Sequence, residues 1–157
     1  MVIVHSIFIS LLFGAVVFDL QARRIPNWLT LPGTVLGLLL AFIFFGTHGL
    51  IDHAIGALIT GGVWFIFWQM GAAGGGDQKL MLMVGAFLGQ QASLVALLVI
   101  ALCGGIQAII TVVWFSIRQR RSFWRKDTWR IVALPYSVSI ALGAVLTLVF
   151  GQLGFFR

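Results

Sequence analysis

The chain alternates long apolar stretches with short polar or glycine-containing breaks, a pattern that predicts an all-α, polytopic membrane protein. A transmembrane helix needs about 20 mostly apolar residues, and the length of this chain suits about six transmembrane helices. We expect residues 1–157 to form a single membrane-embedded domain. The predicted spans cover residues 2–18, 28–45, 50–70, 77–88, 92–117 and 131–150.

The fourth predicted span is too short to cross a bilayer by itself. As a helix, residues 77–88 would rise about 18 Å, against a hydrocarbon core of about 30 Å. A glycine run from Gly71 to Gly76 precedes it, so this irregular backbone is expected to enter the membrane. Such backbone is tolerated there only inside protein or beside a water-filled cavity. Asp77, directly after the glycines, is therefore predicted to lie at such a site.

Composition supports the membrane assignment. The chain is 61% hydrophobic and 9% charged, with a mean hydropathy of +1.08, whereas soluble domains carry about 25% charged residues. The net charge of +6 does not indicate nucleic acid, because the basic residues flank apolar spans, where anionic lipid of the bilayer is the expected partner. Cys103 is the only cysteine and the histidines lack metal-site spacing, so we expect no metal and no cofactor.

The basic residues predict the orientation. If six spans alternate in direction, nine of the ten basic residues fall in loops on one side and only Arg157 falls on the other. The positive-inside rule makes the basic side cytoplasmic. Both termini are then non-cytoplasmic in a multi-pass protein of the cell inner (cytoplasmic) membrane. Most of these residues lie in the loop Arg118–Arg130, which is interpreted as a topology determinant that binds anionic lipid.

The four acidic residues are all aspartates, and the predicted topology brings two of them to one depth. Asp19 ends the first span on the cytoplasmic side, and Asp77, 58 residues later, opens the fourth span on the same side. Asp52 is predicted near the opposite face, and Asp127 lies in the solvated basic loop. Only Asp19 and Asp77 are therefore expected to meet.

Each of these two aspartates also has a simpler explanation. Asp77 can cap the N-terminus of its own helix, and Asp19 can pair with Arg23 four residues later. The helix dipole, however, disfavours a negative charge at the C-terminal end where Asp19 lies. The three glycines before Asp77 are not needed for a cap.

The residues around the two aspartates are predicted to shape a site. Pro26 ends any helix carried over from the first span, and Asn27 is a predicted N-cap of the next helix. Lys79, two residues after Asp77, can interact with that carboxyl group or with an acidic group of a substrate. It can equally extend to the headgroup level as a snorkelling lysine.

Two close carboxyl groups suit the hydrolysis of a peptide bond without a metal. They cannot both ionise easily, so one keeps a proton. The ionised group takes a proton from water as the water attacks the peptide carbonyl, and the protonated group donates to the carbonyl oxygen. Glycines let a substrate backbone approach closely, so we expect an extended segment to lie along Gly74-Gly75-Gly76.

These residues also carry a resemblance. Gly74-Gly75-Gly76-Asp77 matches the GxGD pattern of intramembrane aspartyl proteases, and Asp19 with Arg24-Ile25-Pro26-Asn27 resembles the first-aspartate region of type IV prepilin peptidases. Leu134-Pro135-Tyr136 resembles the proline motif in the last span of that family. The chain is identified as a member of this family, in a short form similar to the prepilin peptidases of Tad/Flp pili.

The resemblance implies an aspartic endopeptidase that removes the basic N-terminal leader of type IV prepilins or pseudopilins at the cytoplasmic face, with Asp19 and Asp77 as the catalytic pair. Larger members also methylate the new N-terminus and have an extra cysteine-rich N-terminal region. This chain begins directly at its first span, and methyltransferase activity is not expected. The residues expected to bind substrate or shape the site are Arg24, Pro26, Asn27, Gly74, Gly75, Gly76 and Lys79.

A second class of function stays open, because a small transporter or ion pathway can also use intramembrane aspartates and a broken helix. Such a transporter often has two corresponding halves with paired broken segments. This sequence has one glycine-interrupted segment and no clear internal repeat. A non-catalytic assembly subunit would leave the two aspartates without a role.

Overall fold

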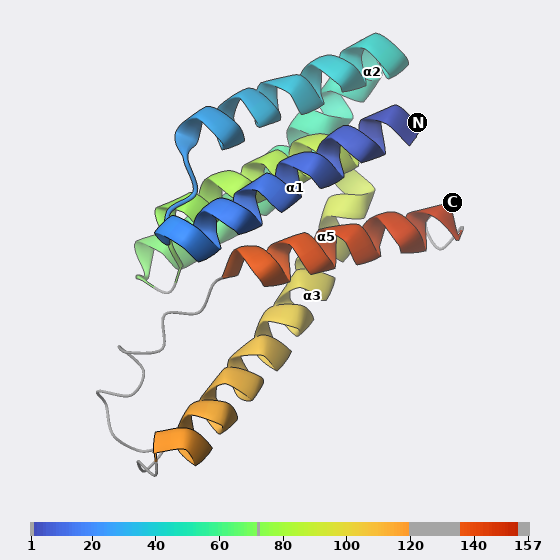
Figure 1. Ribbon diagram of the computed structural model, residues 1–157. Coiled ribbons are helices and arrows are strands. Elements are labelled where there is room, and N and C mark those ends of the chain that lie inside the picture. Colours follow the sequence, from blue (N-terminus) through green and yellow to red (C-terminus); the bar gives the residue numbers. More distant parts are fainter. Residues whose placement is uncertain (1, 72, 120–135, 154–157) are drawn as a thin grey trace.

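The computed structural model describes residues 2–71, 73–119 and 136–153, and the regular structure in these ranges is all helical. The helices are α1 (Val2–Ala22), α2 (Asn27–Gln69), α3 (Gly75–Gln119) and α5 (Tyr136–Gln152) (Figure 1). By length and composition, α1, α2 and residues Gly75–Trp114 of α3 can each cross a membrane. The predicted all-α fold is confirmed.

The prediction of about six transmembrane helices is not supported. Among the described residues there are four helices, of which three are long and apolar enough to span. The predicted breaks at residues 46–49 and 89–91 are single-residue kinks at Gly46 and Gly89, and helical structure resumes at once on either side. The predicted last span, 131–150, is represented by the 17 residues of α5, and residues 131–135 lie outside the described part.

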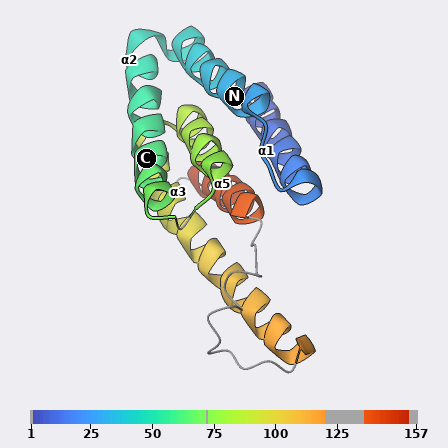
Figure 2. The same cartoon turned by 90° about the vertical axis from the view of Figure 1, so that its left-hand side faces the viewer.

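The chain turns sharply at both kinks. Gly46 has φ 68° and ψ −155°, and Gly89 has φ 77° and ψ 177°. This region of backbone conformation is essentially restricted to glycine. Figures 1 and 2 show α2 folding back on itself and α3 changing direction at these points. The first part of α3 thereby lies against α2.

Side chains from α2 hold the Gly89 kink. Asp52 Oδ2 accepts a hydrogen bond from the Gln90 backbone N–H at 3.2 Å, which satisfies a donor at the start of the next helical segment. His53 Nδ1 donates to the Ala86 carbonyl at 2.9 Å. Asp52 thus lies at the kink between two parts of α3, away from Asp77 at the start of this helix.

Small residues let α2 and α3 pack with their backbones close together. A Cβ atom added to Gly85 would lie 2.2 Å from the Gly56 carbonyl oxygen. Thr60 Oγ1 donates to the Met81 carbonyl at 2.7 Å in the same contact. Close approach at small residues, with interhelical hydrogen bonds, is how helices associate in membranes.

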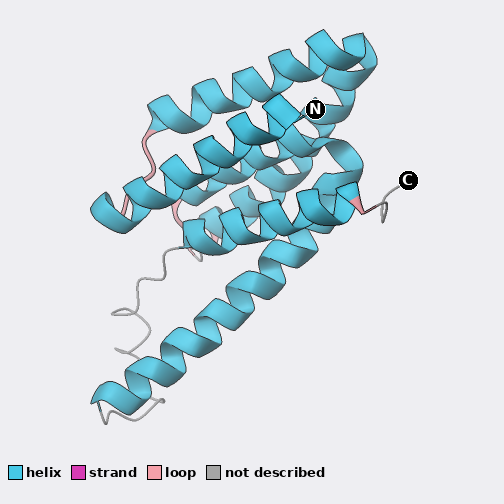
Figure 3. Ribbon diagram, turned by 45° about the vertical axis from the view of Figure 1, so that its right-hand side comes forward, coloured by secondary structure: helices cyan, strands magenta, loops and turns pink. Residues whose placement is uncertain are grey.

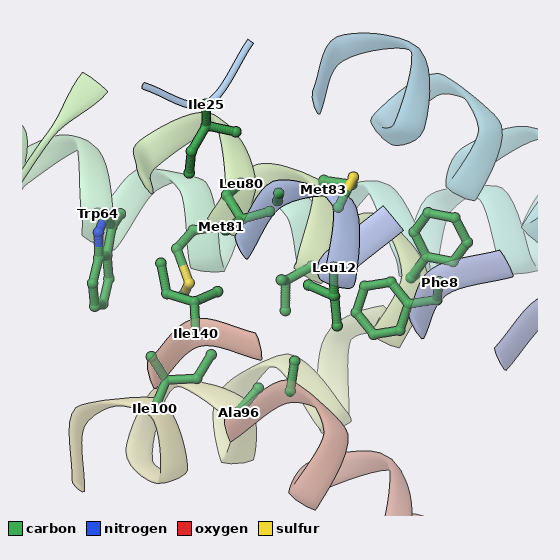
Figure 4. Close-up of a cluster of buried hydrophobic side chains, with 14 residues drawn as sticks. Phe8, Leu12, Ile25, Trp64, Leu80, Met81, Met83, Ala96, Ile100 and Ile140 are labelled. Carbon is green, nitrogen blue, oxygen red and sulfur yellow. The ribbon is translucent and has the colours of Figure 1, made fainter. Parts of the chain in front are cut away.

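The first part of α3 is the centre of the core. Leu80, Met81, Met83 and Val84 are all 0% exposed, and Leu82 between them is half-buried, so most of this segment is enclosed by protein. Figure 4 shows side chains of α1, α2, α5 and the second part of α3 around it. The other core residues of this cluster are Phe8, Leu12, Ala15, Ile25, Trp64, Phe87, Ala96, Ile100, Ile140 and Ala144.

The ends that carry the predicted site residues gather at one end of the bundle. The end of α1 and the starts of α2, α3 and α5 lie together there, whereas the start of α1 and the end of α5 lie at the opposite end (Figures 1 and 3). The loop between α1 and α2 and the loop before α3 therefore meet.

The α2–α3 contact predicts the effect of added volume. Gly85→Ala forces a methyl group against the Gly56 backbone, and overpacking of this kind costs about 1–3 kcal/mol. We expect a lower melting temperature in detergent, measured by tryptophan fluorescence. Gly62→Ala is the control, because a Cβ there meets nothing within 4 Å, and it should be neutral or stabilising. Equal melting temperatures for the two variants would contradict the packing described.

Candidate active site

A cavity of about 280 Å³ opens where the end of α1, the α1–α2 loop and the start of α3 meet. Asp19 and Asp77, 58 residues apart in the sequence, both line it. The remaining described residues that line the cavity are Arg23, Arg24, Ile25, Gly74, Gly75 and Gly76.

Asp19 lies in the last turn of α1, where helix carbonyls have no partner within the helix. Its backbone carbonyl accepts a hydrogen bond from the Arg23 N–H at 2.8 Å. Its carboxylate Oδ2 accepts one from Ser137 Oγ, on α5, at 2.5 Å. No ion pair joins Asp19 and Arg23 in the described part of the chain. The Asp19 carboxylate is instead hydrogen-bonded by the Ser137 hydroxyl group.

Asp77 lies in the first turn of α3, two residues after its first residue. Its Oδ2 accepts a hydrogen bond from the Gly74 N–H at 3.3 Å, and the Gln78 N–H donates to the Gly74 carbonyl at 3.2 Å. Gly74 therefore occupies the N-cap position, and Asp77 bonds back to it as the N3 residue of a capping box does. The capping explanation holds in this form, and it is compatible with a carboxyl group that lines the cavity.

The three glycines before Asp77 are packed closely on different neighbours. A Cβ added to Gly74 would lie 3.0 Å from Asp77 Oδ2, and one added to Gly75 would lie 3.3 Å from Trp68 Nε1. At Gly76 it would lie 3.2 Å from Ile25 Cβ. The three glycines thus contact the Asp77 carboxyl group, α2 and the α1–α2 loop in turn. A side chain at any of them would crowd these neighbours, which explains why three glycines follow one another.

Two arginines form the loop side of the cavity. Arg23 has φ 50°, the left-handed conformation that often ends a helix and that glycine usually adopts. Arg23 and Arg24 are both exposed and line the cavity beside Asp19. Arg24 was expected to shape the site, whereas Arg23 was expected only as a partner of Asp19, and both line the cavity.

Pro26, Asn27 and Lys79, which are described residues, lie outside the lining of this cavity. Pro26, not Asn27, occupies the N-cap position of α2, and it caps without a side-chain hydrogen bond. The prediction of Asn27 as the N-cap is wrong, because Asn27 is already the first residue of α2. Its Oδ1 accepts a hydrogen bond from Lys79 Nζ at 2.7 Å. This bond ties the start of α2 to the start of α3.

The family model described as type IV leader peptidase family matches residues 6–109, more than half of the chain, including Asp19 and Asp77. The chain belongs to the type IV leader peptidase family. The resemblance predicted from the sequence motifs is thereby confirmed.

Two curated relatives carry the name prepilin leader peptidase/N-methyltransferase. The protein of Pectobacterium carotovorum subsp. carotovorum is 30% identical over 151 residues, which cover 91% of this chain and 50% of the relative. The protein of Escherichia coli (strain K12) is 33% identical over 143 residues, covering 84% and 56%. The chain thus spans about half the length of these relatives. No solved structure gives a significant match.

The contacts of several residues at this site were not predicted and come from the structure. Ser137 was not predicted, although it directly follows the tyrosine of the Leu134-Pro135-Tyr136 motif; no spacing rule links it to Asp19. Trp68 and Ile25, which pack on the glycine run, were not predicted either. Leu134, Pro135 and residues 120–130 of the arginine-rich loop lie outside the described residues.

The contact between Ile25 and Gly76 predicts a specific cross-link. Their Cβ positions, 3.2 Å apart, need only a small shift to reach the Cβ–Cβ distance of a disulfide, about 3.5–4.5 Å. In a Cys103→Ala background, we expect the Ile25→Cys/Gly76→Cys variant to lose both free thiols on mild oxidation, measured by maleimide labelling and mass spectrometry.

The matched control is Ile25→Cys/Gly71→Cys, because a Cβ at Gly71 meets nothing within 4 Å. It should keep both thiols under the same conditions. If the control cross-links as readily as the Gly76 pair, the two loops do not meet in the way described.

Proposed function

We propose that the chain is a membrane aspartic endopeptidase that cleaves the N-terminal leader of type IV prepilins or pseudopilins, with Asp19 and Asp77 as its catalytic pair. The observation that carries the proposal is the single cavity lined by both carboxyl groups and the glycine run. Membership of the type IV leader peptidase family and the names of the curated relatives support the substrate class.

In the proposed reaction, one carboxyl group of the pair is ionised and the other protonated, because two close carboxyl groups do not both ionise easily. The ionised group accepts a proton from a water molecule as the water oxygen attacks the peptide carbonyl carbon. The protonated group donates to the carbonyl oxygen. The carboxyl group that took the proton from water then donates it to the leaving nitrogen as the C–N bond breaks. A hydroxyl proton of the tetrahedral intermediate returns to the other carboxylate as the carbonyl re-forms, which restores the pair and releases the leader and the new N-terminus.

The glycine run is proposed to hold the substrate backbone. Gly74, Gly75 and Gly76 line the cavity beside Asp77 without side chains. The backbone of an extended peptide can therefore come close to the backbone of these glycines. Arg24, which lines the same cavity, faces the substrate in this proposal. The Lys79–Asn27 hydrogen bond and Pro26 act indirectly, by keeping the start of α2 against the start of α3.

The orientation follows from the charges. We place the cavity end of the bundle at the cytoplasmic face of the inner membrane, because Arg23, Arg24 and Lys79 are located there and basic residues favour that side. The start of α1 and the end of α5 then lie on the non-cytoplasmic side. The proposal does not extend to the methyltransferase activity named for the curated relatives, since the chain spans about half their length.

The test is cleavage of a full-length prepilin with its leader in membranes that contain each variant. We expect Asp19→Asn and Asp77→Asn each to lose at least about 100-fold in cleavage rate, because an amide can neither accept the proton from water nor donate as an acid. Immunoblotting of the membrane fraction checks that each variant is inserted at the wild-type level.

Asp52→Asn is the matched control. The amide oxygen of this variant can still accept the hydrogen bond from the Gln90 N–H. Residue 52 lies at the Gly89 kink and does not line the cavity, so cleavage should stay within about twofold of wild type. Near-wild-type cleavage by either Asp19→Asn or Asp77→Asn would refute the catalytic pair. It would favour the alternative function, a small transporter or ion pathway.

A further inference from the structure

The Asp19 carboxylate receives its hydrogen bond from the far end of the sequence. Ser137 Oγ donates to Asp19 Oδ2 at 2.5 Å, across 118 residues. Ser137 is 0% exposed and lies in the first turn of α5. It is outside residues 6–109, which the family model matches.

The location of Asp19 explains why such a donor is needed. A carboxylate in the last turn of a helix lies at the negative end of the helix dipole. The start of α5, whose dipole end is positive, is brought to this carboxylate by the Ser137 contact. The serine hydroxyl group adds a hydrogen bond to a charged group, which is about twice as strong as one between neutral groups.

The hydrogen bond also restrains the orientation of the carboxyl group. The terminal torsion of an aspartate is broad, so an unrestrained carboxyl group rotates over a wide range. Asp77 is restrained by the Gly74 N–H and Asp19 by Ser137. Each member of the pair therefore has one oxygen held by a different element, one by the backbone before α3 and the other by α5.

We propose that Ser137 is the positioning residue for Asp19: its hydroxyl group holds this carboxyl group in the orientation in which it faces the cavity shared with Asp77. The proposal rests on the proposed catalytic pair. It makes α5 a part of the active site, since this helix supplies the donor although it contributes no described residue to the cavity lining.

The first experiment measures steady-state cleavage of a purified prepilin in detergent by wild type and Ser137→Ala. We expect kcat to fall about 10- to 100-fold with KM nearly unchanged, because small displacements of a catalytic group cost rate and not substrate binding. A wild-type kcat for Ser137→Ala would overturn the proposal. If Asp19→Asn is also fully active, the proposed function itself fails, whereas an inactive Asp19→Asn confines the failure to Ser137.

The matched control on the same helix is Ser139→Ala. Ser139 is 2% exposed and donates to Gln107 Oε1 on α3, not to a carboxylate. It should keep kcat within about twofold. A loss in Ser139→Ala as large as that in Ser137→Ala would mean that general packing of α5 is responsible, and it would overturn the proposal.

A second pair of variants separates the hydroxyl group from packing. Ser137→Thr and Ser137→Val have the same branched shape, but only threonine keeps the hydroxyl donor. We expect kcat of the threonine variant to exceed that of the valine variant at least about tenfold, at similar KM and melting temperature. Equal kcat values for the two would overturn the proposal, even where Ser137→Ala folds poorly.

Discussion

The segment of α3 between the glycine run and Gly89 is too short to cross a membrane, and its burial shapes the rest of the molecule. Residues 75–88 rise about 21 Å as a helix, against a hydrocarbon core of about 30 Å. A segment of this kind is stable when protein surrounds it, and its central side chains are 0% exposed. The close contact of Gly56 with Gly85 lets α2 cover it. Asp77, in the first turn of this segment, therefore faces the cavity at the end of the bundle.

The polar groups at this end of the bundle satisfy one another across different elements. Asp19 stands at an unfavourable helix end, and Ser137 at the start of α5 compensates for it. Asp77 bonds back to Gly74. Lys79 reaches Asn27 on α2. Because each of these groups finds its partner on another segment or in the turn before its helix, the site is assembled only when the helix ends come together.

This arrangement gives the family membership a structural meaning. The cavity combines two carboxyl groups with a wall of three glycines, and each glycine is packed so closely that an added side chain would press on Asp77, Trp68 or Ile25. The same glycines that allow this tight packing also line the cavity beside Asp77. We propose that such a wall admits a peptide backbone.

The meeting of Asp19 and Asp77 was expected from a topology of six spans, and it is the gathering of helix ends at one end of the bundle that brings both residues to one cavity. Local properties of the sequence determined the helical fold, because apolar length and glycine act within short stretches of chain. They also marked Gly46 and Gly89 as breaks. The way in which the chain turns at Gly89 was decided by the tertiary structure, since Asp52 and His53 of α2 bond to the backbone on either side of this kink. The partners of Asn27 and Asp19 were decided in the same way: Lys79 lies 52 residues and Ser137 118 residues away. A hydrogen bond between residues so far apart depends on how the helices dock, which no local pattern encodes.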